Sequence, residues 1–446
     1  MWKPAAALQE RRRAAWIDCV TSLQAHSAAS KPALVYIDMA YDLKELSRQN
    51  RIGFLDARNR AGLFSRVFSL HPVAGLVQGE TAGRFRIRRT GAGQVVLDGF
   101  HPSIPRSGLR RLLNLLYSQA RMVCAAVRLA RRPDVVVICS TDVFYLGLIA
   151  LVAAKFSGKP FAVAAYQNQD ELFAQSGRLA FPRLLPWRWL EKAVQKLVLS
   201  RADVIEAPTE NMRKYLLANG ARENAITMLP VARLIDPIHL SPPETRESAD
   251  SLIKSWGLDP QAPRMVLISR LIDLKLVEDG VAAMIGICRV IPDTIGLVFG
   301  EGELASTLQK SIDEAGLASR IKLVGKVDQG TLSQLCIGAI IISPLTGMAL
   351  VEASLAGGVP IVYDRDWQPE FVQHGINGFV VPFRDVDAMV QQGVALSSNP
   401  SSLATLRERS RSAGLSFADP DLHREREKEV FGPIVDRWRA RLKDMR

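Results

Sequence analysis

The 446-residue sequence is poor in the residues that build disulfide frameworks and metal sites. It has five cysteines and no CxxC pair, and several of them sit in apolar runs, which favours reduced thiols over disulfides. Its six histidines show no HxH or HExxH spacing, so neither a metal site nor a metal cofactor is expected. No Gly-x-Gly-x-x-Gly with a downstream acidic residue follows a first strand, which argues against a dinucleotide-dependent dehydrogenase.

Long hydrophobic stretches are missing as well. The longest apolar run, 143–154, is too short for a membrane span of about 20 residues. Arg11, Arg12 and Arg13 interrupt the start of the chain, where a signal peptide needs an apolar core. These absences, with the scattered cysteines, predict a cytoplasmic protein that is not integral to a membrane.

Acidic residues are outnumbered by basic ones, which gives a net charge of +12. The excess favours an anionic partner, such as a phosphorylated substrate or acidic lipid headgroups. Nucleic acid is not expected, because the cations are not interleaved with aromatic residues. The segment around Trp187 and Trp189 mixes aromatic, apolar and basic residues, which suits a helix on the cytoplasmic face of a membrane. Packing of this helix on the sheet of its own domain is the favoured alternative.

The length of the chain suggests two domains of roughly 200 residues each. Short apolar segments alternate with helical patterns, which predicts parallel sheets covered by helices on both faces. Strands are expected at 33–38, 134–139, 159–165, 202–207, 264–269, 295–300, 321–325, 339–343 and 359–363. Helices are expected at 108–132, 143–156, 209–219, 277–290 and 304–315.

A stretch rich in proline and serine at 241–248 divides the chain, and its composition is typical of a linker. We therefore predict an α/β protein with an N-terminal Rossmann-like domain at 1–240 and a linker at 241–262. A second Rossmann-like domain at 263–420 and a charged terminal helix at 421–446 complete the organisation.

The most informative segment begins at Pro344 and predicts a turn, a short helix and a buried strand. A helix that begins at Thr346 and Gly347 next to a strand offers free backbone N–H groups, which suit a diphosphate. Glu352, about one and a half turns into that helix, can accept two hydrogen bonds from a ribose diol. An ordinary helix of an α/β sheet explains the segment equally well when it is taken alone.

Other residues at predicted strand ends fit the same site. Arg270 and Lys275 follow one strand, and two such cations can clamp a diphosphate. Gly300 and Gly302 follow the next strand, where a tight turn explains them as well as phosphate approach does. Gly325 ends a third strand, near the place expected for a base.

In this order, the segments resemble the donor half of retaining glycosyltransferases of the GT-B type, family 4-like (glycosyl transferases group 1). The resemblance covers most of 130–385. It implies two Rossmann-like domains with parallel sheets facing a central cleft, and a terminal helix that packs back on the first domain. It also implies metal-independent transfer of a hexosyl or N-acetylhexosaminyl group, with retention, from a nucleotide-sugar to a hydroxyl group. The acceptor would be a glycan, a lipid-linked or a small molecule, as in polysaccharide biosynthesis.

The resemblance also assigns parts to single residues. Arg270 and Lys275 would act on the donor diphosphate, and Glu352 would bind the ribose. Asp170 lies at a strand end that often carries a histidine in the family, and it is the acceptor-side catalytic candidate, with helix capping as the alternative. The implied donor-binding residues are Gly300, Gly302, Gly325, Thr346, Gly347, Met348, Ala349, Leu350, Glu352 and Glu370.

The sequence departs from the family pattern in two places. Pro344 stands where the family commonly has a second glutamate, eight positions before Glu352, and the segment 37–42 replaces a glycine-rich loop. These departures leave a catalytically silent nucleotide-sugar-binding subunit open as an alternative. A nucleotide-sugar epimerase on the same fold is a further alternative, although its acid and base would have to come from strand ends poor in histidine.

Overall fold

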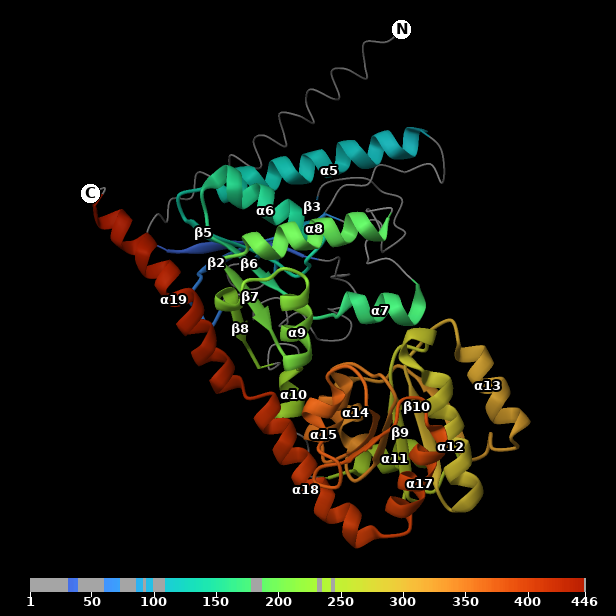
Figure 1. Ribbon diagram of the computed structural model, residues 1–446. Helices are drawn as coiled ribbons and strands as arrows, with labels where there is room; N and C mark the ends of the chain where they lie inside the picture. Colours follow the sequence, from blue (N-terminus) through green and yellow to red (C-terminus); the bar gives the residue numbers. More distant parts are fainter. Residues whose placement is uncertain are drawn as a thin grey trace.

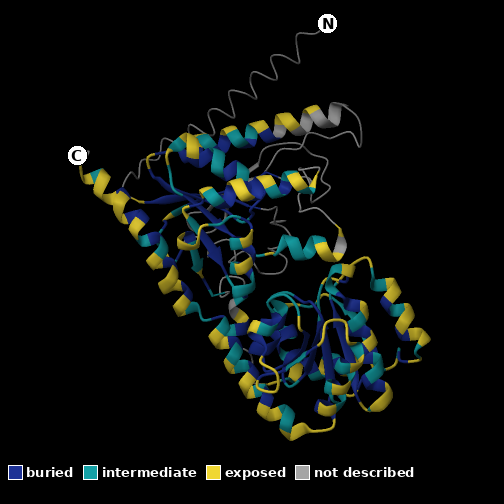
Figure 2. Ribbon diagram, viewed as in Figure 1, coloured by how far each residue is buried: buried dark blue, intermediate teal, exposed yellow. Residues whose placement is uncertain are grey.

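The chain forms two α/β lobes, each built around one sheet with helices on its faces (Figure 1). The computed structural model describes residues 31–38, 60–72, 86–90, 94–98, 109–177, 187–230, 235–241 and 245–444. Buried residues concentrate in the two sheets and on the helix faces that cover them (Figure 2). Arg11, Arg12, Arg13 and most of the loops in 39–107 lie outside the described residues.

The first sheet has eight strands. They are β1 (Ala33–Ile37), β2 (Arg66–His71), β3 (Arg86–Thr90), β4 (Gln94–Asp98), β5 (Val135–Ser140), β6 (Phe161–Ala164), β7 (Val204–Ala207) and β8 (Ile226–Met228). Their spatial order is β3-β4-β2-β1-β5-β6-β7-β8, and only β3 runs antiparallel, to β4. The central strands β1 and β5 are buried along their whole length, as expected for a parallel sheet between two helix layers.

Five helices of the first lobe, α5 to α9, surround this sheet. They are α5 (Leu109–Ala130), α6 (Tyr145–Ser157), α7 (Gln169–Ser176), α8 (Arg188–Arg201) and α9 (Glu210–Ala218). Figure 1 shows α5, α6 and α8 on one side of the sheet, while α7 lies on the side that faces the second lobe. Strands β2, β3, β4 and β8 were not predicted: polar residues interrupt β2 and β3, and the apolar parts of β4 and β8 are only one to three residues long.

The connection between the lobes is more structured than a flexible linker. It contains helix α10 (Pro237–Leu240) and helix α11 (Glu247–Ser255). Ala249 and Ile253 of α11 are buried in a cluster with strands of the second lobe, because two apolar residues four positions apart form one stripe of a helix. The later part of the predicted linker 241–262 thus packs on the second lobe. The predicted domain limits stay a prediction.

The second sheet has six strands. They are β9 (Arg264–Ile268), β10 (Ile295–Phe299), β11 (Ile321–Gly325), β12 (Ile340–Ser343), β13 (Val359–Tyr363) and β14 (Phe379–Val381). All pairs are parallel, in the order β11-β10-β9-β12-β13-β14. The strand order reverses between β9 and β12, and α/β sheets bind ligands beyond the carboxyl ends of the strands at such a point.

The helices of the second lobe alternate with its strands. They are the 3-10 helix η4 (Asp273–Lys275), α12 (Val277–Val290), α13 (Ala305–Glu314), α14 (Gln329–Cys336), α15 (Ala349–Leu355), α16 (Gln368–Phe371), α17 (Val386–Ser397) and α18 (Pro400–Phe417). The two sheets, parallel except for β3, form with their helices the α/β GT-B architecture that the resemblance implied.

The last helix, α19 (Pro420–Asp444), runs from the second lobe along the first (Figure 1). Phe431, Ile434 and Val435 are buried against β1 and β5 residues, and the Trp438 indole N–H donates to the carbonyl of Pro133 at 2.9 Å. Within the described residues, no helix has both the length and the apolar composition needed to cross a bilayer.

Candidate active site

Two cations lie at the reversal point of the second sheet. Arg270 lies two residues after the end of β9 and is exposed, whereas Lys275 ends η4 and is half-buried. Burial and, after it, the neighbouring Arg270 cation lower the pKa of Lys275 to about 8, and Asp366 acts in the opposite direction. The positive charge of this ammonium group is therefore not fully balanced by nearby carboxylates, as expected of a site that binds an anion.

Glycines set the shape of the loop that carries Arg270. A Cβ atom at Gly300 would lie 1.8 Å from the carbonyl oxygen of Ser269, and one at Gly302 would lie 2.1 Å from that of Leu271. Both distances are far below van der Waals contact, so only glycine permits the two loops to pass this closely. The tight-turn explanation thus holds for both glycines, and their part in binding a donor remains a prediction.

The turn before α15 differs in detail from its prediction. The helix begins at Ala349 rather than at Thr346 and Gly347, because the Thr346 hydroxyl bonds to that of Ser343 and the Leu350 amide donates back to the carbonyl of Gly347 at 3.0 Å. The Leu350 amide is therefore occupied. The amides of Gly347, Met348 and Ala349 make no hydrogen bond to another described residue.

Glu352 is buried, with 6% of its surface exposed. Two groups of the connection between the lobes approach its carboxylate. The backbone N–H of Asp236 donates to Oε1 at 3.4 Å, and Nε2 of His239 lies 3.9 Å from Oε2. Neither contact is a short hydrogen bond, so this carboxylate keeps capacity to accept from further donors.

Glu370 lies at a contact between the lobes. Its carboxylate accepts from the backbone N–H groups of Glu210 at 2.6 Å and Asn211 at 2.5 Å, at the start of α9 in the first lobe. Close by in sequence, Arg365 forms an ion pair with Glu171 of α7. The structure therefore uses Glu370 as a helix cap across the lobes, an arrangement favoured by the positive end of a helix.

A pocket of about 250 Å³ lies where α7 meets the second lobe. It is lined by Ala174, Gln175, Asp273, Leu274, Leu276, Arg365, Phe383 and Arg384. Since these residues come from both lobes, the two Rossmann-like domains face each other across an open space at this place.

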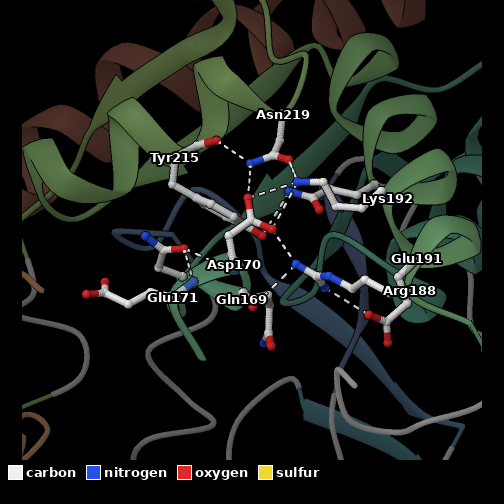
Figure 3. A network of polar contacts seen from close by, with 10 residues as sticks. Gln169, Asp170, Glu171, Arg188, Glu191, Lys192, Tyr215 and Asn219 are labelled. Atoms are coloured by element: carbon white, nitrogen blue, oxygen red, sulfur yellow. Dashed lines mark hydrogen bonds and ion pairs between the residues drawn. The ribbon is translucent and has the colours of Figure 1, made fainter. Parts of the chain in front are cut away.

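The acceptor-side candidate Asp170 lies in a network of polar side chains on the first lobe (Figure 3). Its carboxylate pairs with Arg188 and with Lys192, the latter at 2.8 Å, and Asn219 donates to it at 2.8 Å. Capping of α7 falls to Asn168, whose side chain accepts from the amides of Asp170 and Glu171.

The charge state of Asp170 follows from these contacts. Burial alone would raise its pKa, but the hydrogen bonds from Lys192 and Asn219 and the charges of Lys192 and Arg188 outweigh burial and lower it. Asp170 is therefore held ionised, between helices α7, α8 and α9. This state fits a group that orients the strand end better than one that exchanges protons near neutral pH.

Three residues were not predicted, two after strands and one in the connection between the lobes. Asp366 follows β13 in a left-handed backbone conformation, with φ of 58°, and its pKa is raised to about 6, chiefly by burial and then by Glu171. Asp142 follows β5, and burial raises its pKa to about 7. His239 belongs to the connection between the lobes. Position after a buried strand was a usable signal for the two aspartates, whereas nothing in the sequence marks His239.

Comparisons with known proteins agree with this architecture. Residues 248–413 match the family Glycosyl transferases group 1, and residues 60–232 match the Glycosyl transferase 4-like domain. Together the two matches cover about three quarters of the chain. Among the residues that the structure describes, no group of three or more His, Cys, Asp or Glu side chains is placed to hold a metal ion.

Curated relatives are distant, and each matches over only part of its length. An exopolysaccharide phosphotransferase of Streptomyces coelicolor is 27% identical over 39% of this chain and 19% of its own length. A poly(glycerol-phosphate) alpha-glucosyltransferase of Bacillus subtilis is 24% identical over 48% and 30%. A GDP-mannose-dependent phosphatidylinositol monomannoside mannosyltransferase of Mycobacterium tuberculosis is 28% identical over 28% and 36%. The chain thus spans less than two fifths of the length of these relatives.

Solved structures match nearly the whole fold. HepE of Anabaena, in complex with UDP and glucose, superimposes with a TM-score of 0.66 at 15% identity, over 90% of this chain and all of that one. Sucrose-phosphate synthase of Thermosynechococcus elongatus gives 0.68 at 14% identity, over 91% and 99%. At such identities the likeness concerns the fold.

The two facing Rossmann-like lobes, each built on one α/β sheet, have the GT-B fold of glycosyltransferases. With the two family matches, the assignment becomes specific. The chain belongs to the group 1, family 4-like glycosyltransferases.

Proposed function

We propose that this protein transfers a hexosyl or N-acetylhexosaminyl group from a nucleotide-sugar to an acceptor hydroxyl, with retention of the anomeric configuration and without a metal. The observation that carries the proposal is the electrostatic state of the site. Arg270 and Lys275 concentrate positive charge after β9, and burial together with Arg270 lowers the pKa of Lys275 to about 8. A donor diphosphate would supply the missing negative charge.

The carboxylate of Glu352 fits the other end of the donor. It is buried, its two contacts are 3.4 and 3.9 Å long, and a ribose diol would complete its hydrogen bonding. The unbonded amides of Gly347, Met348 and Ala349 lie in the turn just before its helix, where the diphosphate and the transferred sugar would join the ribose. These placements are part of the proposal.

The proposed step needs no protein carboxylate as a nucleophile. The bond between the anomeric carbon and the diphosphate oxygen breaks, and the electron pair leaves with the nucleoside diphosphate. The acceptor oxygen attacks from the same face, and its proton passes to an oxygen of the departing phosphate. Arg270 and Lys275 stabilise the charge that develops on this leaving group. Asp170 enters the proposal as the residue that orients the acceptor-side strand end through Arg188, Lys192 and Asn219.

For the acceptor, we propose a glycan or a lipid-linked molecule that bears negative charge. The net charge of +12 favours anionic partners. The names of two relatives, a poly(glycerol-phosphate) glucosyltransferase and a phosphatidylinositol mannoside mannosyltransferase, contain phosphate-bearing acceptors. Exposed Trp187 and Trp189 at the start of α8 stack at 6.0 Å and would let the enzyme bind reversibly to an anionic membrane on the cytoplasmic side.

The experiment is a turnover assay of the purified protein with a panel of UDP- and GDP-sugars. Release of nucleoside diphosphate would be measured with and without glycerol-phosphate polymer or phosphatidylinositol mannoside vesicles. Transfer predicts release that depends on acceptor, and NMR of the product should show the anomeric configuration of the donor. Conversion of the sugar without release would support an epimerase, and binding without either reaction would support a silent subunit. Membership of the group 1 family favours transfer over both.

A further inference from the structure

The connection between the lobes places a histidine beside the proposed ribose carboxylate. His239, in the four-residue helix α10, is 1% exposed. Its Nε2 lies 2.8 Å from Oε1 of Gln329 at the start of α14 and 3.9 Å from Oε2 of Glu352 in α15. One imidazole nitrogen thus faces two acceptors that belong to two different helices of the second lobe.

The hydrogen bond to Gln329 fixes the tautomer of His239. An amide oxygen only accepts, so Nε2 must carry the proton and donate it. The same N–H edge is directed at Glu352, whereas Nδ1 is buried without a partner among the described residues. Burying a polar nitrogen without a protein partner is costly.

Packing ties the same segment to the helix that carries Glu352. Ile235 is buried in one cluster with Leu350, Val351 and Leu355 of α15, and Leu240 packs against that cluster. The backbone N–H of Asp236 reaches Oε1 of Glu352 at 3.4 Å, so both carboxylate oxygens have a neighbour in 235–240. The connection between the lobes therefore determines where this carboxylate points.

We infer that His239 is a positioning residue for donor recognition, which acts by orienting the Glu352 carboxylate toward the ribose hydroxyls. The inference rests on the proposed function, because it takes Glu352 as the ribose-binding group. With His239 beside Oε2 and the Asp236 amide beside Oε1, the remaining lone pairs of the carboxylate are directed to a diol. Since His239 belongs to the connection between the lobes, recognition of the ribose depends on how that connection is seated.

The test compares ribonucleotides with 2′-deoxyribonucleotides. Dissociation constants of UDP and 2′-deoxy-UDP, and of GDP and 2′-deoxy-GDP, are measured by titration calorimetry for the wild type, His239→Leu and His239→Gln. We expect the wild type to prefer its ribonucleotide about tenfold or more, the effect of one hydrogen bond to a charged group. His239→Leu should lose most of this preference while its affinity for the deoxynucleotide stays unchanged. His239→Gln, which keeps an N–H donor, should retain it.

Two further variants make the result decisive. Gln329→Leu removes the acceptor that holds the Nε2–H tautomer of His239, so it should also reduce the preference for the ribonucleotide. This variant tests the inference even if His239→Leu does not fold. His374→Gln changes an exposed histidine of the same lobe and should leave it as in the wild type. If His239→Leu binds the ribonucleotide and the deoxynucleotide more weakly by the same factor, His239 is only structural and the inference is wrong. The inference is also wrong if His239→Leu and Gln329→Leu both keep the preference of the wild type for the ribonucleotide.

The outcome also separates this inference from the proposed function. If Glu352→Gln loses the ribose preference but the His239 and Gln329 variants keep it, only the part assigned to His239 is wrong. If the wild type binds neither UDP nor GDP, the proposed function fails, and the inference fails with it.

Discussion

Replacing Lys275 by methionine should make the ligand-free protein more stable and the enzyme much less active. The side chain is half-buried, and methionine has a similar length without the charge. Burial and the neighbouring Arg270 disfavour the ammonium group. If the Lys275 ammonium binds a donor diphosphate, its charge destabilises the folded protein whenever the donor is absent.

The pKa of Lys275 gives the size of the effect. A lowering from 10.5 to about 8 corresponds to a destabilisation of about 3 kcal/mol, since one pH unit is worth about 1.36 kcal/mol. Lys275→Met removes this term, so at about pH 7 the Tm of the lobe should rise by several degrees. In the same variant, kcat/KM should fall by the equivalent of about 2–4 kcal/mol, because a cation that stabilises the leaving group is lost.

The effect has a pH signature with a definite sign. Below about pH 8 the lysine is protonated in both the folded and the unfolded protein, and the full destabilisation is present. Between about 8 and 10.5 the unfolded chain binds the proton that the folded protein has released, so the stability of the wild type rises with pH. The stability advantage of Lys275→Met should therefore shrink across this window.

The assay is thermal unfolding of the wild type and of Lys275→Met from about pH 7 to 10, with turnover measured on the same samples. Lys310→Met, an exposed lysine on α13, is the matched control and should change neither quantity. A variant that is less stable at about pH 7 would mean that Lys275 is a structural cation with its own partner. Wild-type turnover by Lys275→Met would refute the diphosphate clamp.

Three other residues and pairs give separate predictions. Glu352→Gln should raise the Kd of the nucleoside diphosphate about tenfold in titration calorimetry, with nearly unchanged Tm, and unaltered binding would contradict the ribose assignment. Glu370→Ala should loosen the two lobes and increase the radius of gyration in X-ray scattering, because the α9 amides lose their carboxylate, whereas Glu370→Gln keeps an acceptor and should change it less. Identical scattering of Glu370→Ala and the wild type would show that Glu370 does not hold the two lobes together. Replacing Trp187 and Trp189 by alanine should reduce cosedimentation with acidic vesicles, which should also fall as salt rises, and equal binding to neutral vesicles would remove the electrostatic contribution.

Local sequence patterns determined the general architecture. Continuous apolar segments predicted the buried parallel strands, since a strand covered on both faces has no polar side to mark it. For β11, β13 and α12 the predicted limits agree with the structure residue by residue. Arg270 and Lys275 could be found because their place after a strand depends on chain order alone.

Other parts of the site depend on segments that are far apart in the chain. Glu370 reaches α9 across 160 residues, and Asp170 meets Arg188, Lys192 and Asn219 only after three helices pack together. No local sequence pattern predicts these long-range contacts, because the same residues also occur on solvent-exposed helices. The start of α15 was misplaced for a similar reason, since contacts to Ser343 and Gly347 hold Thr346 and its neighbours in a turn.

The sequence by itself determined that the chain has two Rossmann-like domains and that cations follow β9, because hydrophobic periodicity and strand ends are local properties. Tertiary structure alone decided which charges are compensated. Asp170 meets two cations, half-buried Lys275 has the Arg270 cation as a neighbour, and Glu352 meets the connection between the lobes at Asp236 and His239. Burial and electrostatic pairing join residues that are distant in the chain, and they are settled only when the helices and the two lobes come together.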